Sequence, residues 1–228
     1  MDRVAIVTGA SRGLGLALAL ALGERGWRLI VDARGADELE AARAELAAST
    51  EVHALAGDIA DETHRRALVE RAAELGRLDL LVNNASVLGA SPLPPLAEYP
   101  TSTLEDVFRV NVIAPLALLQ AALPLLERSR GRIVNVTSDA AVEAYEGWGG
   151  YGASKAALEQ LTSVLAAEQP ELRVYAVDPG DMNTRMQQEA YPGEDVSDRP
   201  PPESAVPGLL VLVEGDLPSG RYRAPELA

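Results

Sequence analysis

The sequence has no cysteine among its 228 residues and only two histidines, His53 and His64. Without cysteine there can be no disulfide bridge, no thiolate metal site and no cysteine nucleophile. With so few histidines we also expect no metal site. A chain of this length buries about 70% of its unfolded surface, so a hydrophobic core can hold it without such cross-links.

Lysine is nearly absent as well, since 19 of the 20 basic residues are arginine and Lys155 is the single lysine. The 34 acidic residues give a net charge of −14. A surface this acidic repels phosphate backbones and anionic lipids, so we expect neither nucleic acid nor a membrane as partner. We see no signal-peptide pattern and no uninterrupted apolar run of about 18 residues, which favours a cytoplasmic location.

Short apolar strands alternate with amphipathic helices along the chain. We expect strands at 3–8, 27–33, 52–56, 78–83, 131–137 and 172–178, and helices at 14–24, 36–48, 61–75, 102–128, 150–168 and 202–214. This alternation predicts an α/β fold, a doubly wound parallel sheet with helices on both faces, in one domain spanning 1–228. The proline-rich segments 89–100 and 181–202 follow strand ends, so we expect them at the rim of a site, with the second as substrate loop.

A glycine-rich turn connects the first expected strand to the first expected helix. Glycine allows a tight turn, close approach of the backbone to a pyrophosphate and close packing of helix on strand. The helix N-terminus then offers free N–H groups to phosphates. Because of its place between strand and helix, the turn predicts nucleotide binding rather than a plain connection. Its candidate residues are Thr8, Gly9, Ser11, Arg12, Gly13, Leu14 and Gly15.

Tyr151 and Lys155 are four residues apart in an expected helix, so they share one face. An ammonium beside a phenol favours the phenolate, which predicts a lowered pKa for Tyr151 and a role as general acid or base. Ser138, at the end of the fifth expected strand, could hydrogen-bond a substrate oxygen. The chain's only lysine stands where this chemistry requires a lysine.

These motifs together resemble the short-chain dehydrogenase/reductase family over nearly the whole chain. The resemblance implies a Rossmann fold and hydride transfer between NAD(P) and a small carbonyl or alcohol substrate. It implies that Tyr151 exchanges the proton, Ser138 orients the substrate oxygen, and Lys155 orients the ribose and lowers the Tyr151 pKa. It also implies that Asn111 holds a water linking Lys155 to solvent, although this asparagine could instead bond helix backbone.

The resemblance extends to further cofactor contacts. Asp58 and Ile59 match the adenine contact, and 83–86 matches a motif in which Ser86 replaces the usual glycine. Pro179, Gly180 and Thr184 match a segment beside the nicotinamide. The full set implied in this way is Asp58, Ile59, Asn84, Ala85, Ser86, Pro179, Gly180, Met182 and Thr184, with Tyr151 and Lys155.

The choice between NAD and NADP depends on the residues after the second strand. An acid there accepts hydrogen bonds from the ribose of NAD, whereas an arginine pairs with the 2′-phosphate of NADP. The sequence has Asp32, Ala33 and Arg34, and the family register places Ala33 at the discriminating position. Arg12 could form the other side of a phosphate clamp. We therefore favour NADP(H); Asp32 leaves NAD(H) open if the strand ends one residue earlier.

Other readings remain open at this stage. A non-catalytic nucleotide sensor, or a short-chain epimerase or dehydratase, would use the same fold. Tyr145, Glu146 and Trp148 could line the substrate pocket or only pack a loop. The apolar faces of the helices at 102–128 and 150–168 predict a homodimer or homotetramer.

Overall fold

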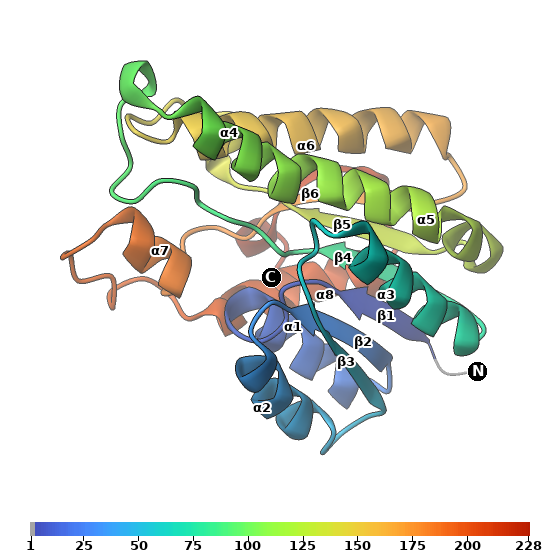
Figure 1. Ribbon diagram of the computed structural model, residues 1–228. Coiled ribbons are helices and arrows are strands. Elements are labelled where there is room, and N and C mark those ends of the chain that lie inside the picture. Colours follow the sequence, from blue (N-terminus) through green and yellow to red (C-terminus); the bar gives the residue numbers. More distant parts are fainter. Residues whose placement is uncertain (1–2) are drawn as a thin grey trace.

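A seven-stranded parallel sheet forms the centre of the computed structural model, which describes residues 3–228 (Figure 1). The strands are β1 (Val4–Val7), β2 (Arg28–Ala33), β3 (Val52–Ala56), β4 (Leu80–Asn83), β5 (Arg132–Val136), β6 (Arg173–Asp178) and β7 (Gly220–Arg223). Their order is β3-β2-β1-β4-β5-β6-β7. The chain thus winds outward from β1 in both directions, which confirms the predicted doubly wound sheet.

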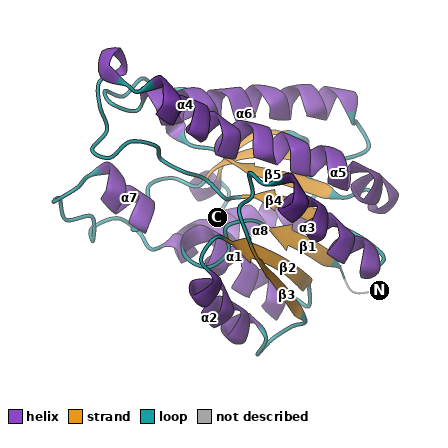
Figure 2. Cartoon of the chain, viewed as in Figure 1, coloured by secondary structure: helices purple, strands orange, loops and turns teal. Residues whose placement is uncertain are grey.

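Helices cover both faces of the sheet (Figure 2). They are α1 (Gly13–Glu24), α2 (Ala36–Leu46), α3 (Glu62–Glu74), α4 (Thr101–Phe108), α5 (Ala114–Ser129), α6 (Gly149–Glu168), α7 (Arg185–Ala190) and α8 (Val206–Glu214). Helices α1, α2 and α8 contribute to one core cluster, and α3, α5 and α6 to the other. Along β1, Ala5 and Val7 face the first cluster while Val4 and Ile6 face the second. Burial on both sides explains why this strand has no polar alternation.

The C-terminal region differs from the sequence-based expectation. Residues 220–223 form β7, an edge strand beside β6, where no seventh strand was expected. The strand is short and half arginine, so its sequence lacks the apolar run that marks the other strands. Arg223 and Arg221 lie 3.3 and 3.7 Å from the buried Asp178 carboxylate. The expected helix at 202–214 is divided into a 3₁₀ turn, Pro202–Ala205, and α8.

Residues Thr101–Ser129 form one continuous helical segment in which a π turn, Arg109–Ile113, joins α4 to α5. The π turn immediately precedes Pro115, which has no N–H to donate to the Asn111 carbonyl four residues earlier. By length and mean hydropathy (1.6) the segment could cross a membrane, but half of its most apolar window is buried inside the domain. Its buried side belongs to the second core cluster.

Asp32 ties the glycine turn to the sheet and to α3. Its carboxylate is 2% exposed, accepts a hydrogen bond from the Gly9 N–H at 2.8 Å and lies 3.0 Å from His64 Nε2. Strand β2 continues through Ala33, so the condition under which Asp32 would reach a cofactor ribose is not met. This carboxylate is a structural anchor.

We expect Asp32→Ala to lower the free energy of unfolding by about 3 kcal/mol, because it leaves buried polar partners unsatisfied. The exposed Asp37 on α2 provides a matched control, and Asp37→Ala should change stability by less than about 0.5 kcal/mol. Urea unfolding followed by circular dichroism measures both. Equal stability of the two variants would contradict the anchoring role.

Candidate active site

A cavity of about 1200 Å³ opens at the carboxyl ends of the parallel strands. It is lined by the β1–α1 turn, by the segments that follow β2, β4, β5 and β6, and by α6 and α7. Ligand sites of about 300–1000 Å³ hold a drug-sized molecule, so this cavity has room for a dinucleotide together with a small substrate. Its place confirms the predicted position of a site at this edge of the sheet.

The glycine turn forms one end of the cavity. Gly9 and Gly13 have φ angles of 66° and 57°, in the left-handed region that favours glycine. A Cβ on Gly9 would lie 2.9 Å from the Ala85 Cα, so only glycine allows this close approach. Arg12 precedes α1 without a side-chain cap, which leaves the first N–H groups of α1 available to an anion. The turn therefore fits the phosphates of a dinucleotide.

Thr8 and Gly15 lie behind this surface and do not line the cavity. The Thr8 hydroxyl accepts hydrogen bonds from the Asn84 and Ala85 N–H groups, both at 3.0 Å. A Cβ on Gly15 would collide with the Gly9 carbonyl oxygen, which is the close packing of helix on strand that the sequence predicted. Both residues shape the turn from within.

Two arginines and one acid surround the end of β2. Arg12 and Arg34 line the cavity, as the sequence predicted. Arg12 Nη1 lies 2.6 Å from Glu38 Oε2, an ion pair that the sequence analysis did not foresee. Glu38 is four residues past Arg34 in the first turn of α2, and its exposed position on that helix gave no signal of a partner across the cavity.

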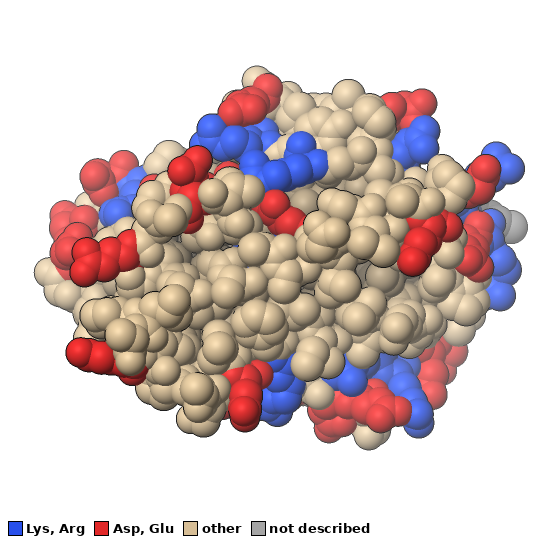
Figure 3. Space-filling view, turned by 90° about the horizontal axis from the view of Figure 1, so that it is seen from above, with Lys and Arg blue, Asp and Glu red and all other residues tan. Residues whose placement is uncertain are grey.

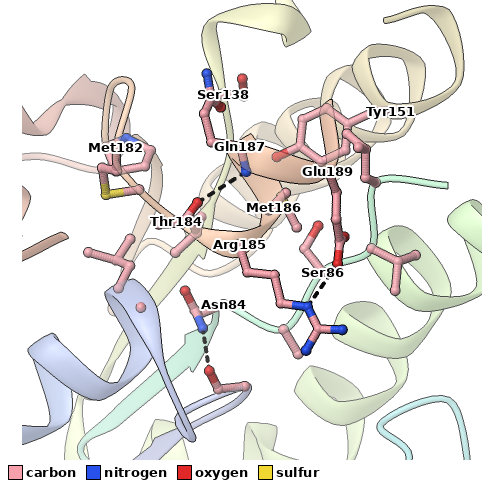
Figure 4. Close-up of a pocket in the computed structure, with 18 of the residues that line it drawn as sticks. Asn84, Ser86, Ser138, Tyr151, Met182, Thr184, Arg185, Met186, Gln187 and Glu189 are labelled. Atoms are coloured by element: carbon pink, nitrogen blue, oxygen red, sulfur yellow. Dashed lines mark hydrogen bonds and ion pairs between the residues drawn. The ribbon is translucent and has the colours of Figure 1, made fainter. Parts of the chain in front are cut away.

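The opposite end of the cavity brings Ser138, Tyr151 and Lys155 together. Tyr151 lies in the first turn of α6, and Lys155 follows one turn later on the same face. Lys155 Nζ donates to the Val136 carbonyl at 2.8 Å and lies 5.4 Å from the centre of the Tyr151 ring. Figure 4 shows Ser138 and Tyr151 side by side above the chain of Asn84 and Ser86.

Burial shifts the pKa values of the buried pair in opposite directions. It lowers the pKa of Lys155 from 10.5 to about 8. It raises the pKa of Tyr151 well above 10, an effect that the nearby Ser86 hydroxyl opposes and the Asp139 and Asp178 carboxylates reinforce. The sequence spacing predicted a lowered Tyr151 pKa; the loss of water around the phenolate outweighs the attraction of the ammonium.

Ser138 has an acidic neighbour that the sequence analysis missed. Its hydroxyl donates to Asp139 Oδ1 at 2.9 Å, and the Tyr145 hydroxyl donates to Asp139 Oδ2 at 3.0 Å. The Asp139 carboxylate therefore orients both hydroxyl groups at this wall. Tyr145 and Trp148 line the cavity, which settles one of the open alternatives for them, whereas Glu146 does not.

The Asn111 side chain follows the structural alternative. Its Oδ1 accepts from the Val87 N–H, and its Nδ2 donates to the Val87 carbonyl, both at 2.9 Å. The same Nδ2 donates to Ser154 Oγ at 3.0 Å. The amide is thus fully used in fixing the segment after β4 against α6, and Asn111 does not line the cavity among the described residues.

The expected substrate loop carries α7, which covers the cavity. Thr184 caps this helix by accepting from the Gln187 N–H at 3.3 Å, and Arg185 pairs with Glu189 at 3.0 Å (Figure 4). Ser91, in the other proline-rich segment, donates to the Glu189 carbonyl at 2.7 Å. The two segments expected at the rim therefore meet each other across the site.

The family model for short chain dehydrogenases matches residues 3–195. The chain belongs to the short-chain dehydrogenase family. It is 35% identical to a rhamnolipid-biosynthesis 3-oxoacyl-[acyl-carrier-protein] reductase from Pseudomonas aeruginosa, over 98% of this chain and 85% of that protein. It is 36% identical to a benzil reductase from Saccharomyces cerevisiae, over 83% of this chain and 75% of that one.

Solved structures agree with this assignment. A short chain dehydrogenase from Shigella flexneri, complexed with NADP, superimposes with a TM-score of 0.90 at 31% identity. The match covers 98% of this chain and 97% of that one. The protein is thus an NAD(P)-dependent oxidoreductase of the short-chain dehydrogenase family.

The cavity gathers most of the residues that the family resemblance implied. Those that line it are Gly9, Ser11, Arg12, Gly13, Leu14, Arg34, Asp58, Ile59, Asn84, Ala85, Ser86, Ser138, Tyr151, Lys155, Pro179, Gly180, Met182 and Thr184. Thr8, Gly15 and Asn111 support this set from behind. Residues not foreseen are Glu38 and Asp139, and Glu189 and Tyr191 from the region of α7.

The buried Lys155 predicts a specific pH dependence of stability. Between pH 8 and 10.5 the unfolded chain holds the lysine proton and the folded chain does not, so stability rises with pH over this window. Relative to Lys155→Met, which carries no titrating group, the wild-type protein should gain free energy of unfolding from pH 7.5 to pH 10. Urea unfolding at both pH values measures the difference. A difference that stays constant would contradict the lowered pKa.

Proposed function

We propose that this protein transfers a hydride between NADP(H) and the carbonyl or alcohol carbon of a small molecule. The observation that carries this proposal is the convergence of Ser138, Tyr151 and Lys155 on the cavity into which the glycine turn opens. A nucleotide sensor would not need a buried ammonium beside a phenol, because burying a charge is costly unless it serves a purpose.

The proton at the substrate oxygen comes from Tyr151. A nicotinamide cofactor, when bound, supplies or accepts the hydride. Because burial raises its pKa, the Tyr151 phenol holds its proton at neutral pH and is ready to give it to a carbonyl oxygen. Oxidation of an alcohol needs the phenolate and so becomes faster as pH rises. These properties favour the reductive direction at neutral pH.

Ser138 and Lys155 prepare the same oxygen and the cofactor. The Ser138 hydroxyl can turn from Asp139 to the substrate oxygen and stabilise its developing charge. Lys155, whose pKa near 8 keeps most of the ammonium charged at pH 7, lies where it can attract both the phenolate and ribose hydroxyl groups. Asn111 fixes the floor beneath them, and we propose that its backbone carbonyl, left without a donor at Pro115, takes part in a proton relay.

The residues near the adenosine end support NADP(H) over NAD(H). Asp32 is used inside the fold, and Ala33 offers no acid to a ribose. Arg34 is exposed at the cavity edge, and Arg12 lies across from it. Glu38 partly neutralises Arg12, so the preference depends chiefly on Arg34.

We also propose that the chain forms homodimers or homotetramers through α4, α5 and α6. Ile113 and Val164 expose 57% and 42% of their area on this face. Figure 3, which looks down on this side, shows a broad uncharged area with acidic and basic side chains mostly toward its edges. A large apolar patch of this kind fits self-association through a symmetric interface.

Tyr151→Phe tests the proposed chemistry. It should lower kcat by about a hundredfold or more, because the acid–base proton is lost, while the Kd for NADPH changes by less than about threefold. Tyr222→Phe, outside the cavity, is the matched control and should retain full activity. Absorbance of the reduced nicotinamide reports both assays. A Tyr151→Phe enzyme that keeps more than about a tenth of the wild-type kcat would exclude Tyr151 as the acid.

Arg34→Ala tests the cofactor preference. It should weaken NADPH binding by about tenfold or more and leave NADH binding nearly unchanged, because only NADPH has the 2′-phosphate. Arg43→Ala, an exposed arginine of α2 that does not line the cavity, should affect neither cofactor. Calorimetric titration gives both Kd values, and equal losses for the two cofactors would mean that Arg34 does not read the phosphate.

A further inference from the structure

We propose, building on the proposed function, that the substrate is an uncharged carbonyl compound with an aromatic group, and that the site discriminates against anionic substrates. The argument concerns the substrate end of the cavity, meaning the part of its wall formed by 86–91, 138–151 and 181–191. Two independent features of this wall carry it, its aromatic side chains and its charge.

The first feature is a concentration of aromatic rings. The chain has only nine aromatic residues, yet four of them line the substrate end: Tyr145, Trp148, Tyr151 and Tyr191. The ring centres of Trp148 and Tyr151 are 5.6 Å apart in an edge-to-face arrangement, and those of Trp148 and Tyr191 are 6.2 Å apart. Leu88 and Met186 pack with the same cluster. A flat ring entering beside Tyr151 would therefore meet ring faces and edges, which aromatic groups prefer.

The second feature is the lack of an available positive charge. Among the described residues of the substrate end, Asp139, Asp181 and Glu189 line the cavity, and Arg185 is the one arginine or lysine. Arg185 is already paired with Glu189 at 3.0 Å. The other basic lining groups are Arg12 and Arg34 at the adenosine end, and Lys155, which donates to Val136 beneath Tyr151.

A substrate that carries a carboxylate, or a phosphate on a carrier, would meet net negative charge at this end. Like charges that are close in a partly dehydrated cavity repel each other, and no unpaired guanidinium compensates. An uncharged aromatic ketone meets neither penalty and gains from the ring contacts. The geometry thus points away from acyl groups on anionic carriers, although one relative is named for such a substrate.

The test compares four ketones of similar size with NADPH: acetophenone, 4-acetylbenzoate, 4′-(trimethylammonio)acetophenone and cyclohexyl methyl ketone. We expect kcat/KM for acetophenone to exceed the values for 4-acetylbenzoate and cyclohexyl methyl ketone by about tenfold or more. The cationic ketone should be closer to acetophenone than the anionic ketone is. Equal or faster turnover of 4-acetylbenzoate, or of cyclohexyl methyl ketone, would overturn the proposal.

Variants separate the site from the intrinsic reactivity of each ketone. Glu189→Gln frees Arg185 and should narrow the gap between acetophenone and 4-acetylbenzoate by about threefold or more at low salt, with less effect at high salt. Glu194→Gln removes an equal charge from the same loop outside the cavity and should leave the gap unchanged. Tyr191→Leu should reduce the ratio of acetophenone to cyclohexyl methyl ketone. A gap that responds equally to both glutamate variants would reject a role for the local charge.

Binding is measured alongside turnover, so that this proposal and the proposed function can fail separately. Quenching of tryptophan fluorescence reports ketone binding, because Trp148 lines the cavity while Trp27 is buried in the core, and Trp148→Phe identifies the signal. Turnover in a different order of ketones would reject the substrate class and retain hydride transfer. Binding in the expected order without turnover would reject hydride transfer and retain the ligand class. Neither binding nor turnover of acetophenone would reject both.

Discussion

The contact between the turn after β1 and the turn after β4 determines where everything else in the site can lie. The Thr8 hydroxyl accepts from the Asn84 and Ala85 N–H groups, and Asn84 Nδ2 returns hydrogen bonds to the Thr8 and Gly9 carbonyls at 2.8 and 3.1 Å. These bonds hold two neighbouring strand ends so close that residue 9 must be glycine. Through this contact the phosphate-binding turn and the wall that carries Ser86 and Tyr151 become parts of one cavity.

The sequence predicted the parts of the fold that depend on local pattern. The six apolar strands, the glycine turn and the spacing of Tyr151 and Lys155 can each be recognised from a few adjacent residues, and the structure places them as expected. Strand β7 was missed because an edge strand at the end of a sheet needs few apolar residues. The pairs Arg12–Glu38 and Ser91–Glu189 join residues 26 and 98 positions apart, a relation that no local pattern contains.

Burial explains the one chemical expectation that the structure reverses. Spacing alone shows that an ammonium and a phenol share a helix face, and from this a lowered phenol pKa follows. Spacing does not show how much water surrounds them, and here Tyr151 and Lys155 are 7% and 2% exposed. The cost of removing a phenolate from water depends on the whole domain, including the carboxylates of Asp139 and Asp178, which come from two other strand ends.

The same burial gives a physical reason for the single lysine in a chain that otherwise uses arginine. The Lys155 ammonium reaches the Val136 carbonyl with one donor and turns its others toward the cavity. A guanidinium carries five N–H donors in a fixed plane and cannot lose its charge, so the same confined space would leave donors unsatisfied beside a permanent charge. Lysine can instead adapt its pKa to the site. A compositional preference for arginine can therefore extend over the whole surface and still stop at the position where a compact and titratable cation has to be buried.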